Sequence, residues 1–209
     1  SGPVCTQFDG FKNYYQGEAW TWEFMALTRA RPIYGPTGLQ KVLAQIIEDA
    51  IRQPRDAKVL VRDVDTMRQR IRKQYPGDKP WEIKHRPGGL VDIEFITQYL
   101  QLRHAADGKD ILSTNTGTAL EKLAEAGYLE TVVAQDLRSA LRLWRNLQTA
   151  IRLTAQEGLD EEKAPDGQKA LLARCGGFED FPSLRDHIAE VAETVRQHYQ
   201  DLIAGPAEE

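Results

Sequence analysis

The sequence has few of the residues that build disulfide frameworks, zinc sites or membrane spans. Its 209 residues include two cysteines, Cys5 and Cys175, with no Cys-x-x-Cys pair and no Cys/His pair at metal-ligand spacing. We therefore expect no bound metal and no disulfide, and a reducing, cytoplasmic compartment. The apolar runs fall far short of the roughly 20 residues that a membrane helix requires. No secretory signal segment opens the chain, so we expect a protein that does not enter a membrane.

The charge balance narrows the possible partners. A net charge of -4 at pH 7 argues against generic nucleic-acid binding by the whole chain. The charge is nevertheless uneven: Arg52 to Arg86 holds eleven Lys/Arg against five Asp/Glu, whereas Ala155 to Glu209 holds five against thirteen. With 41% hydrophobic residues, the chain can bury the core of one substantial domain, or of a domain and a fragment of another.

Apolar residues recur at helical spacing almost throughout the chain after Glu18. Short loops separate long segments, which favours antiparallel neighbours. We therefore predict an all-α fold, a bundle of antiparallel helices. Asn115 or Thr116 is a suitable N-cap, and Gly127 suits a helix C-terminus. The helices are expected at residues 9–15, 18–29, 39–51, 60–75, 89–106, 116–126, 129–157, 168–174 and 182–203.

Two segments favour extended backbone instead. Residues 3–8 alternate like a short strand, which needs partners outside this chain unless the segment is an arm lying on the helices. The start Ser1-Gly2-Pro3 has no initiator Met, so we interpret it as a cut inside a longer protein. Residues 81–84 are expected to be extended, because Pro80 and Pro87 disfavour helix around them.

A basic, glycine-rich turn precedes the helix expected at 89–106. The first N–H groups of a helix are unpaired, and glycines let backbone approach a ligand closely, so phosphate is a natural guest. Lys84 and Arg86 add positive charge and, on extended backbone, face one side together. We take Lys84, Arg86, Gly88 and Gly89 as phosphate-binding candidates; the alternative is that the glycine pair only forms a turn after Pro87.

The helix after this turn has two acids near its start. Asp92 lies in the first turn, where the helix dipole stabilises an acid without any ligand. Glu94 lies about 200° around the helix from Asp92, so the two are not expected to form a pair for acid/base catalysis. One of them is expected to hold a basic residue, Lys84 or Arg86, while the other faces outward or toward an interface.

The first long helix combines aromatic and basic residues. Trp20 and Trp22, with Phe24 and Met25, cover too much of the circumference for one core stripe, which indicates a helix buried on two sides. Arg29 and Arg31 suit the negative C-terminal end of this helix and are also nucleotide-binding candidates. Farther along, one group of basic residues is expected to form a solvated face: Arg62, Arg68, Arg70, Arg72 and Lys73.

Two motifs, residues 19–32 (AWTWEFMALTRARP) and 81–96 (WEIKHRPGGLVDIEFI), occur in an order that resembles glutamine synthetase adenylyltransferase. The resemblance covers essentially the whole chain, although Phe24 stands where a His is expected. It implies that residues 1–16 are the tail of a nucleotidyltransferase fold, a last strand and a helix, and that residues 17–209 form the helical bundle domain. Enzymes of this family have two related halves, one that adds AMP and one that removes it. In both motifs the residues look more like those of the adenylylating half.

The resemblance implies AMP transfer from ATP to a tyrosine hydroxyl of glutamine synthetase, which regulates nitrogen assimilation. The carboxylates that hold Mg²⁺ and position ATP belong to an upstream Gly-Ser…Asp-x-Asp segment, which this chain lacks. We therefore expect no catalytic residue here and no activity of the chain alone. Expected partners are glutamine synthetase, the PII signalling protein and the upstream nucleotidyltransferase domain.

Two rival interpretations remain. One is a non-catalytic helical module that binds PII or glutamine synthetase. The other is the helical appendage of a uridylyltransferase-type enzyme, against which the tryptophan-rich helix argues.

Overall fold

The computed structural model describes residues 6–155 and 158–208, and the regular structure in this part of the chain is all helical. The predicted all-α fold is confirmed. The strand predicted at residues 3–8 falls partly on residues 3–5, which lie outside the described residues; Thr6 and Gln7 form no regular structure, and Phe8 begins a helix. The helices are α1 (Phe8–Gly17), α2 (Thr21–Leu27), α3 (Thr37–Ile51), α4 (Ala57–Gln74), α5 (Leu90–His104), α6 (Thr116–Glu125), α7 (Thr131–Thr154), α8 (Asp166–Gly176), α9 (Phe181–Tyr199) and α10 (Gly205–Glu208), with a 3₁₀ turn η1 (Ala105–Asp107) and a π-helical turn η2 (Gln200–Ala204).

Side-chain caps begin several of these helices, as polar residues before apolar runs suggested. Asn115 accepts hydrogen bonds from the N–H groups of Gly117 and Thr118, and Gly127 has a left-handed φ of 80° just after α6. Both predictions at α6 are therefore confirmed. The helix predicted at 18–29 is shorter, because the Glu23 carboxylate accepts from the Trp20 N–H and fixes the start of α2 at Thr21.

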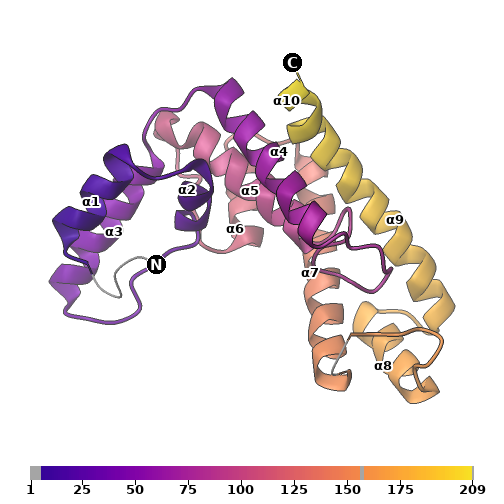
Figure 1. Ribbon diagram of the computed structural model, residues 1–209. Helices are drawn as coiled ribbons and strands as arrows, with labels where there is room; N and C mark the ends of the chain where they lie inside the picture. Colours follow the sequence, from indigo (N-terminus) through magenta and orange to yellow (C-terminus); the bar gives the residue numbers. More distant parts are fainter. Residues whose placement is uncertain (1–5, 156–157, 209) are drawn as a thin grey trace.

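The bundle is built around α5 (Figure 1). This helix packs against α2, α4, α6, α7 and α9, and eleven of its fifteen residues are buried. Neighbouring helices therefore cover α5 on several sides. At one end of the molecule α1 packs on α3, and α2 joins this pair to the bundle; at the other end α8 packs between α7 and α9.

Aromatic contacts hold α1 in place. The Tyr15 ring lies 4.8 Å from the Phe11 ring and 5.3 Å from the Phe24 ring, centroid to centroid. The Tyr14 hydroxyl donates to Glu23 at 2.5 Å, and this bond is the main cause that raises the Tyr14 pKa to about 12. The boundary at residue 16 between two domains stays a prediction.

A buried ion pair connects α4 to α5. The Arg68 Nε lies 2.5 Å from Asp92 Oδ1, and both side chains are almost fully buried. The other oxygen of Asp92 accepts the Gly88 N–H at 2.6 Å, and Arg68 Nη2 donates to the His85 carbonyl at 3.1 Å. We call Arg68, Asp92 and Gly88 the Asp92 joint, because together they fix the chain between α4 and α5.

Arg68 does not belong to a solvated face, so that prediction was wrong for this residue, which is 4% exposed. It lies four residues after buried Val64, on the inner stripe of α4. A charge can occupy such a position only when a partner compensates it, and Asp92 does so.

The turn at Gly88 packs directly on α7 and α9. The Trp144 indole, fully buried, donates to the Gly88 carbonyl at 3.1 Å. Gly88 has a φ of +74°, and a Cβ at this position would lie 1.8 Å from the Ala192 carbonyl oxygen. Only glycine therefore fits where the turn crosses α9.

In the described residues, no helix is both long and apolar enough to cross a membrane.

We predict that Gly88→Ala destabilises the fold by at least about 3 kcal/mol, because left-handed strain adds to a clash with backbone that cannot move away. The matched control is Gly108→Ala, whose φ is +78° but whose Cβ would meet no atom within 4 Å, so strain alone costs roughly 1–2 kcal/mol. Urea unfolding of both variants measures the difference. Equal losses would contradict the packing explanation.

We also predict that Arg68→Met lowers the free energy of unfolding by about 3–5 kcal/mol, because it leaves the Asp92 carboxylate buried without a countercharge. The double variant Arg68→Met/Asp92→Asn is expected to lose less, because the amide is neutral and its oxygen still accepts the Gly88 N–H. Arg196→Met, which removes an exposed pair with Glu193, is expected to change stability little. A double variant less stable than Arg68→Met would refute this account.

Candidate functional site

The segment between α4 and α5 forms successive turns, so the predicted extended backbone at residues 81–84 was wrong. The Glu82 N–H donates to the Lys79 carbonyl at 3.0 Å, and the Arg86 N–H donates to the Glu82 carbonyl at 3.1 Å. Pro80 and Pro87 exclude a regular helix here, but they do not exclude turns. Lys84 and Arg86 therefore do not alternate along a strand, and they line separate cavities.

Arg86 stabilises the turn through contacts of its own side chain. Its Nη1 donates to the Pro80 carbonyl at 2.6 Å, and its guanidinium lies 5.6 Å from the Trp144 ring centroid. Burial lowers the Arg86 pKa. The neighbouring His85 ring stacks on the Tyr75 ring, with their centroids 4.7 Å apart. The His85 pKa is lowered mainly by burial and further by the charge of Lys84. These contacts give Arg86 a structural role that the sequence did not indicate.

The N-terminus of α5 gives no support to a phosphate cradle. The Gly88 N–H donates to Asp92, and the Gly89 N–H donates to the Arg86 carbonyl at 2.9 Å. The next two N–H groups, of Leu90 and Val91, donate to the carbonyls of residues 83 and 84, both at 3.1 Å. All four donors are used within the protein, and a Cβ on Gly89 would lie 2.6 Å from the Ile83 carbonyl oxygen. The glycine pair serves close packing.

The two acids of α5 bind different cations. Asp92 pairs with Arg68, not with Lys84 or Arg86 as predicted, because the turn brings Arg86 onto Trp144 instead. Glu94 is also paired: its Oε1 lies 2.6 Å from Arg29 Nη1, and this ion pair connects the end of α2 to α5. The carboxylates are therefore separate structural anchors and form no acid/base pair.

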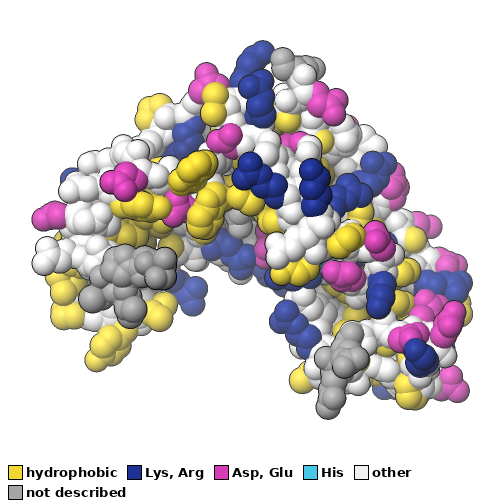
Figure 2. All heavy atoms as spheres, viewed as in Figure 1, with side chains coloured by type: hydrophobic (Ala, Val, Ile, Leu, Met, Phe, Trp, Pro, Cys, Tyr) yellow, Lys and Arg dark blue, Asp and Glu magenta, His cyan; other side chains and the backbone are white. Residues whose placement is uncertain are grey.

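The tryptophan-rich helix presents aromatic surface to solvent in this chain. Trp20 is 70% exposed and Trp22 is 49% exposed, whereas Met25 and Leu27 on the same helix are buried against the bundle. Figure 2 shows hydrophobic side chains gathered over α2, with Lys and Arg side chains beside them over α4. Arg31, just beyond α2, is exposed as well. One face of α2 is thus buried and the other is exposed, so the predicted burial on two sides is not found within the described residues.

A groove of about 410 Å³ lies beside this aromatic surface, between α2 and α4. Its walls include Trp20, Trp22, Met67 and Arg70, and a hydrogen bond from the Thr21 hydroxyl to Asp63 joins the two helices there. We call Trp20, Trp22 and this groove the α2 surface.

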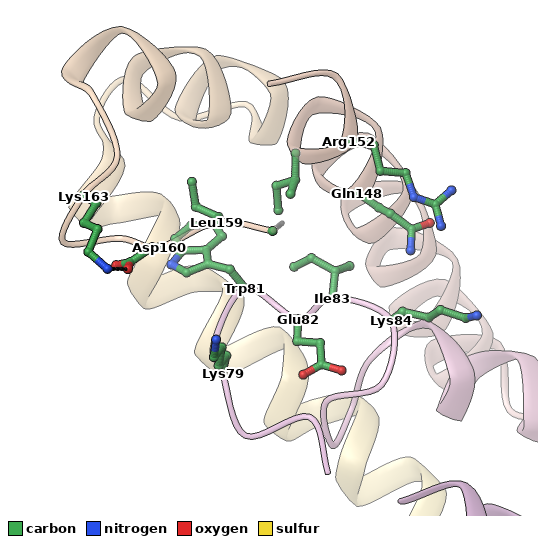
Figure 3. A pocket seen from close by; sticks show the side chains of 12 residues that line it. Lys79, Trp81, Glu82, Ile83, Lys84, Gln148, Arg152, Leu159, Asp160 and Lys163 are labelled. Carbon is green, nitrogen blue, oxygen red and sulfur yellow. Dashed lines mark hydrogen bonds and ion pairs between the residues drawn. The ribbon is translucent and has the colours of Figure 1, made fainter. Parts of the chain in front are cut away.

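A larger cavity, of about 700 Å³, lies beside Lys84 (Figure 3). It is bounded by the turn at 79–84, the C-terminal part of α7 and the loop at 158–163. Its floor is apolar and buried, and its rim is polar, with side chains that are half-buried or exposed. We call it the α7 pocket. Its floor includes Trp81, Ile83, Ile151 and Leu159, and its rim includes Lys79, Glu82, Lys84, Gln148, Arg152, Asp160 and Lys163.

Of the rim residues only Lys84 was predicted as a site residue, and those that the prediction missed include Gln148 and Arg152. They lie four residues apart on α7, so they share one face of that helix, and Figure 3 shows them with Lys84 along the same side of the pocket. The sequence alone could not pair Lys84 with residues more than 60 positions away. The usable signal was the polar loop after α7, since loops beside rigid helices commonly hold binding residues.

Within residues 6–155 and 158–208, no three His, Cys, Asp or Glu side chains are grouped so that they could hold a metal ion. The resemblance implies Mg²⁺ ligands in an upstream segment, and the described residues of this chain form no such set.

Comparisons with known proteins fall on two parts of the chain. A family model described as glutamate-ammonia ligase adenylyltransferase matches residues 1–46, which include α2. A second model, described as GlnD PII-uridylyltransferase, matches residues 58–203, which include the Asp92 joint and the α7 pocket. The bundle thus resembles a uridylyltransferase family, while the tryptophan-rich segment matches the adenylyltransferase model.

Curated relatives match almost the whole chain. The bifunctional glutamine synthetase adenylyltransferase/adenylyl-removing enzyme of Rhodopseudomonas palustris (strain TIE-1) is 40% identical over 98% of this chain, and that of Caulobacter vibrioides is 42% identical over 98%. The enzyme of the same name from Bradyrhizobium sp. (strain BTAi1 / ATCC BAA-1182) is 37% identical over 97%. The chain spans 21% of the length of each of these relatives. The chain therefore corresponds to one segment of the glutamine synthetase adenylyltransferases that it matches, and its residues 58–203 belong to the family described as GlnD PII-uridylyltransferase.

Proposed function

We propose that this chain is the helical domain of an enzyme that transfers AMP from ATP to a tyrosine hydroxyl of glutamine synthetase. The relatives that match 97–98% of the chain are named for adenylyl transfer to, and removal from, glutamine synthetase. The observation that carries the structural part of the proposal is the α2 surface. It lies in the segment that matches the adenylyltransferase model, and it is bare in this chain.

On this proposal, the α2 surface is where the nucleotidyltransferase domain packs. Met25 and Leu27 anchor α2 in the bundle, and the Arg29–Glu94 pair fixes its end, so the exposed tryptophans are held on a rigid support. Two large aromatic side chains beside an apolar groove are typical of a protein–protein contact. A short helix fixed in this way would set the orientation of the catalytic domain relative to the bundle.

The proposed division of labour follows from the residues present. ATP and Mg²⁺ would be held by carboxylates of the nucleotidyltransferase domain, where the ion would stabilise the leaving oxygen. Arg29 is engaged by Glu94, so of the two arginines at the end of α2, the exposed Arg31 is the better candidate to reach a nucleotide. The proposed compartment is the cytoplasm, and the proposed macromolecular partners are glutamine synthetase and PII.

The main alternative is a regulatory module that binds PII or glutamine synthetase and leaves catalysis unaffected. The α2 surface would then contact the signalling partner. The uridylyltransferase alternative is disfavoured by the relatives that match nearly the full chain, since they are named adenylyltransferases.

We predict that Trp20→Ala/Trp22→Ala, made in the full-length enzyme, lowers the rate of AMP transfer to glutamine synthetase at least tenfold, because the catalytic domain loses its packing surface. Transfer of labelled AMP from ATP, at saturating and limiting ATP, measures this. Val132→Ala/Leu153→Ala, which removes two exposed apolar side chains of α7, is the control and should leave the rate unchanged. An unchanged rate in the tryptophan variant, with loss of the response to PII, would support the regulatory module and contradict the proposal.

A further inference from the structure

The α7 pocket has an excess of positive charge on its rim. Its four cations are Lys79, Lys84, Arg152 and Lys163, and its two acids are Glu82 and Asp160. One cation is neutralised locally, because Lys163 Nζ lies 2.8 Å from Asp160 Oδ2. The other three cations, Lys79, Lys84 and Arg152, form no ion pair with any of the described residues. The rim therefore keeps charge that an anion could neutralise.

Two of these cations lie along one side of the pocket. Lys84 comes from the turn and Arg152 from α7, with the Gln148 side chain on the same face of α7 as Arg152 (Figure 3). Arginine and lysine donate charge-assisted hydrogen bonds to carboxylate and phosphate oxygens, and an amide adds a neutral donor. The elements that hold them are anchored in the core through the buried side chains of Ile83 and Ile151.

The floor of the α7 pocket suits an organic body attached to that group. The Trp81 ring is stacked on Phe181 at 4.8 Å, and its Nε1 donates to Glu161 Oε2 at 3.0 Å, so the indole cannot turn away. Leu159 is buried at the same floor. A cavity of about 700 Å³ falls within the range of roughly 300–1,000 Å³ found for small-molecule sites. An inorganic ion would leave most of this space empty.

We propose that the α7 pocket binds a small organic anion, whose phosphate or carboxylate meets Lys84 and Arg152 and whose apolar or planar body rests on the floor beside Trp81. The pocket lies at the α7–α8 end of the bundle, away from α2, so this site is separate from the α2 surface (Figure 1). Binding at the α7 pocket is independent of the function proposed above for the α2 surface. A bound anion would clamp the turn that leads into the Asp92 joint to the end of α7.

Calorimetric titration of the 209-residue chain tests this, with AMP, indole-3-acetate and inorganic phosphate as probes. AMP and indole-3-acetate present the two sources of anionic charge, phosphate and carboxylate, on a planar body, and inorganic phosphate has no such body. We expect at least one organic probe to bind at least tenfold more tightly than inorganic phosphate. The probe that binds identifies the anionic group.

The variant Lys84→Gln/Arg152→Gln should weaken that binding at least tenfold. The matched control Arg72→Gln/Lys73→Gln removes one arginine and one lysine that are equally exposed on α4 but do not line the pocket, and it should bind like the parent chain. Circular dichroism verifies that both variants stay folded. The proposal is overturned if no organic probe binds, if inorganic phosphate binds as tightly as the organic probes, or if both double variants lose binding equally.

Discussion

The Asp92 carboxylate is the group on which the rest of this structure depends. One oxygen pairs with Arg68 of α4, and the other accepts the N–H of Gly88 in the turn that precedes α5. Removing a carboxylate and a guanidinium from water costs several kcal/mol for each ion, so the pair is tolerated only because both charges are paired and hydrogen-bonded. The same turn offers its Gly88 carbonyl to Trp144 of α7 and its backbone to α9. Four helices are thus placed relative to one another by a few polar contacts and by the close packing of Gly88 on α9.

Both surfaces of functional interest follow from this arrangement. On one side, α5 holds α2 through the Glu94–Arg29 pair, which leaves Trp20 and Trp22 facing outward on a fixed helix. On the other side, the turn places Lys84 on the rim of the same pocket as Arg152 of α7. The glycine pair suggested a phosphate cradle, but in the structure Gly88 and Gly89 allow close packing of backbone. Lys84 lines a cavity instead. The basic residues of the motif therefore have different roles.

The helices could be predicted from the sequence because their apolar periodicity and caps are local properties. The predicted helix at 116–126 and the observed α6 agree at the cap residue, since Asn115 needs only its own backbone neighbours. The extended backbone at 81–84 was mispredicted, because proline excludes helix but does not choose between strand and turns. The partner of Asp92 could not be deduced from adjacent residues, although Arg68 lies on the buried stripe of α4, and that position was the available signal. The α7 pocket depends on contacts between segments more than 60 residues apart, which no local pattern encodes.

Hydrogen–deuterium exchange in the variant Asp92→Ala tests the central claim most directly, with Glu94→Ala as the control on the same helix. If the Asp92 carboxylate organises the turn, the amides of Leu90 and Val91, which donate to the carbonyls of Ile83 and Lys84, lose protection in Asp92→Ala and keep it in Glu94→Ala. Unchanged protection of these amides in Asp92→Ala would contradict the account.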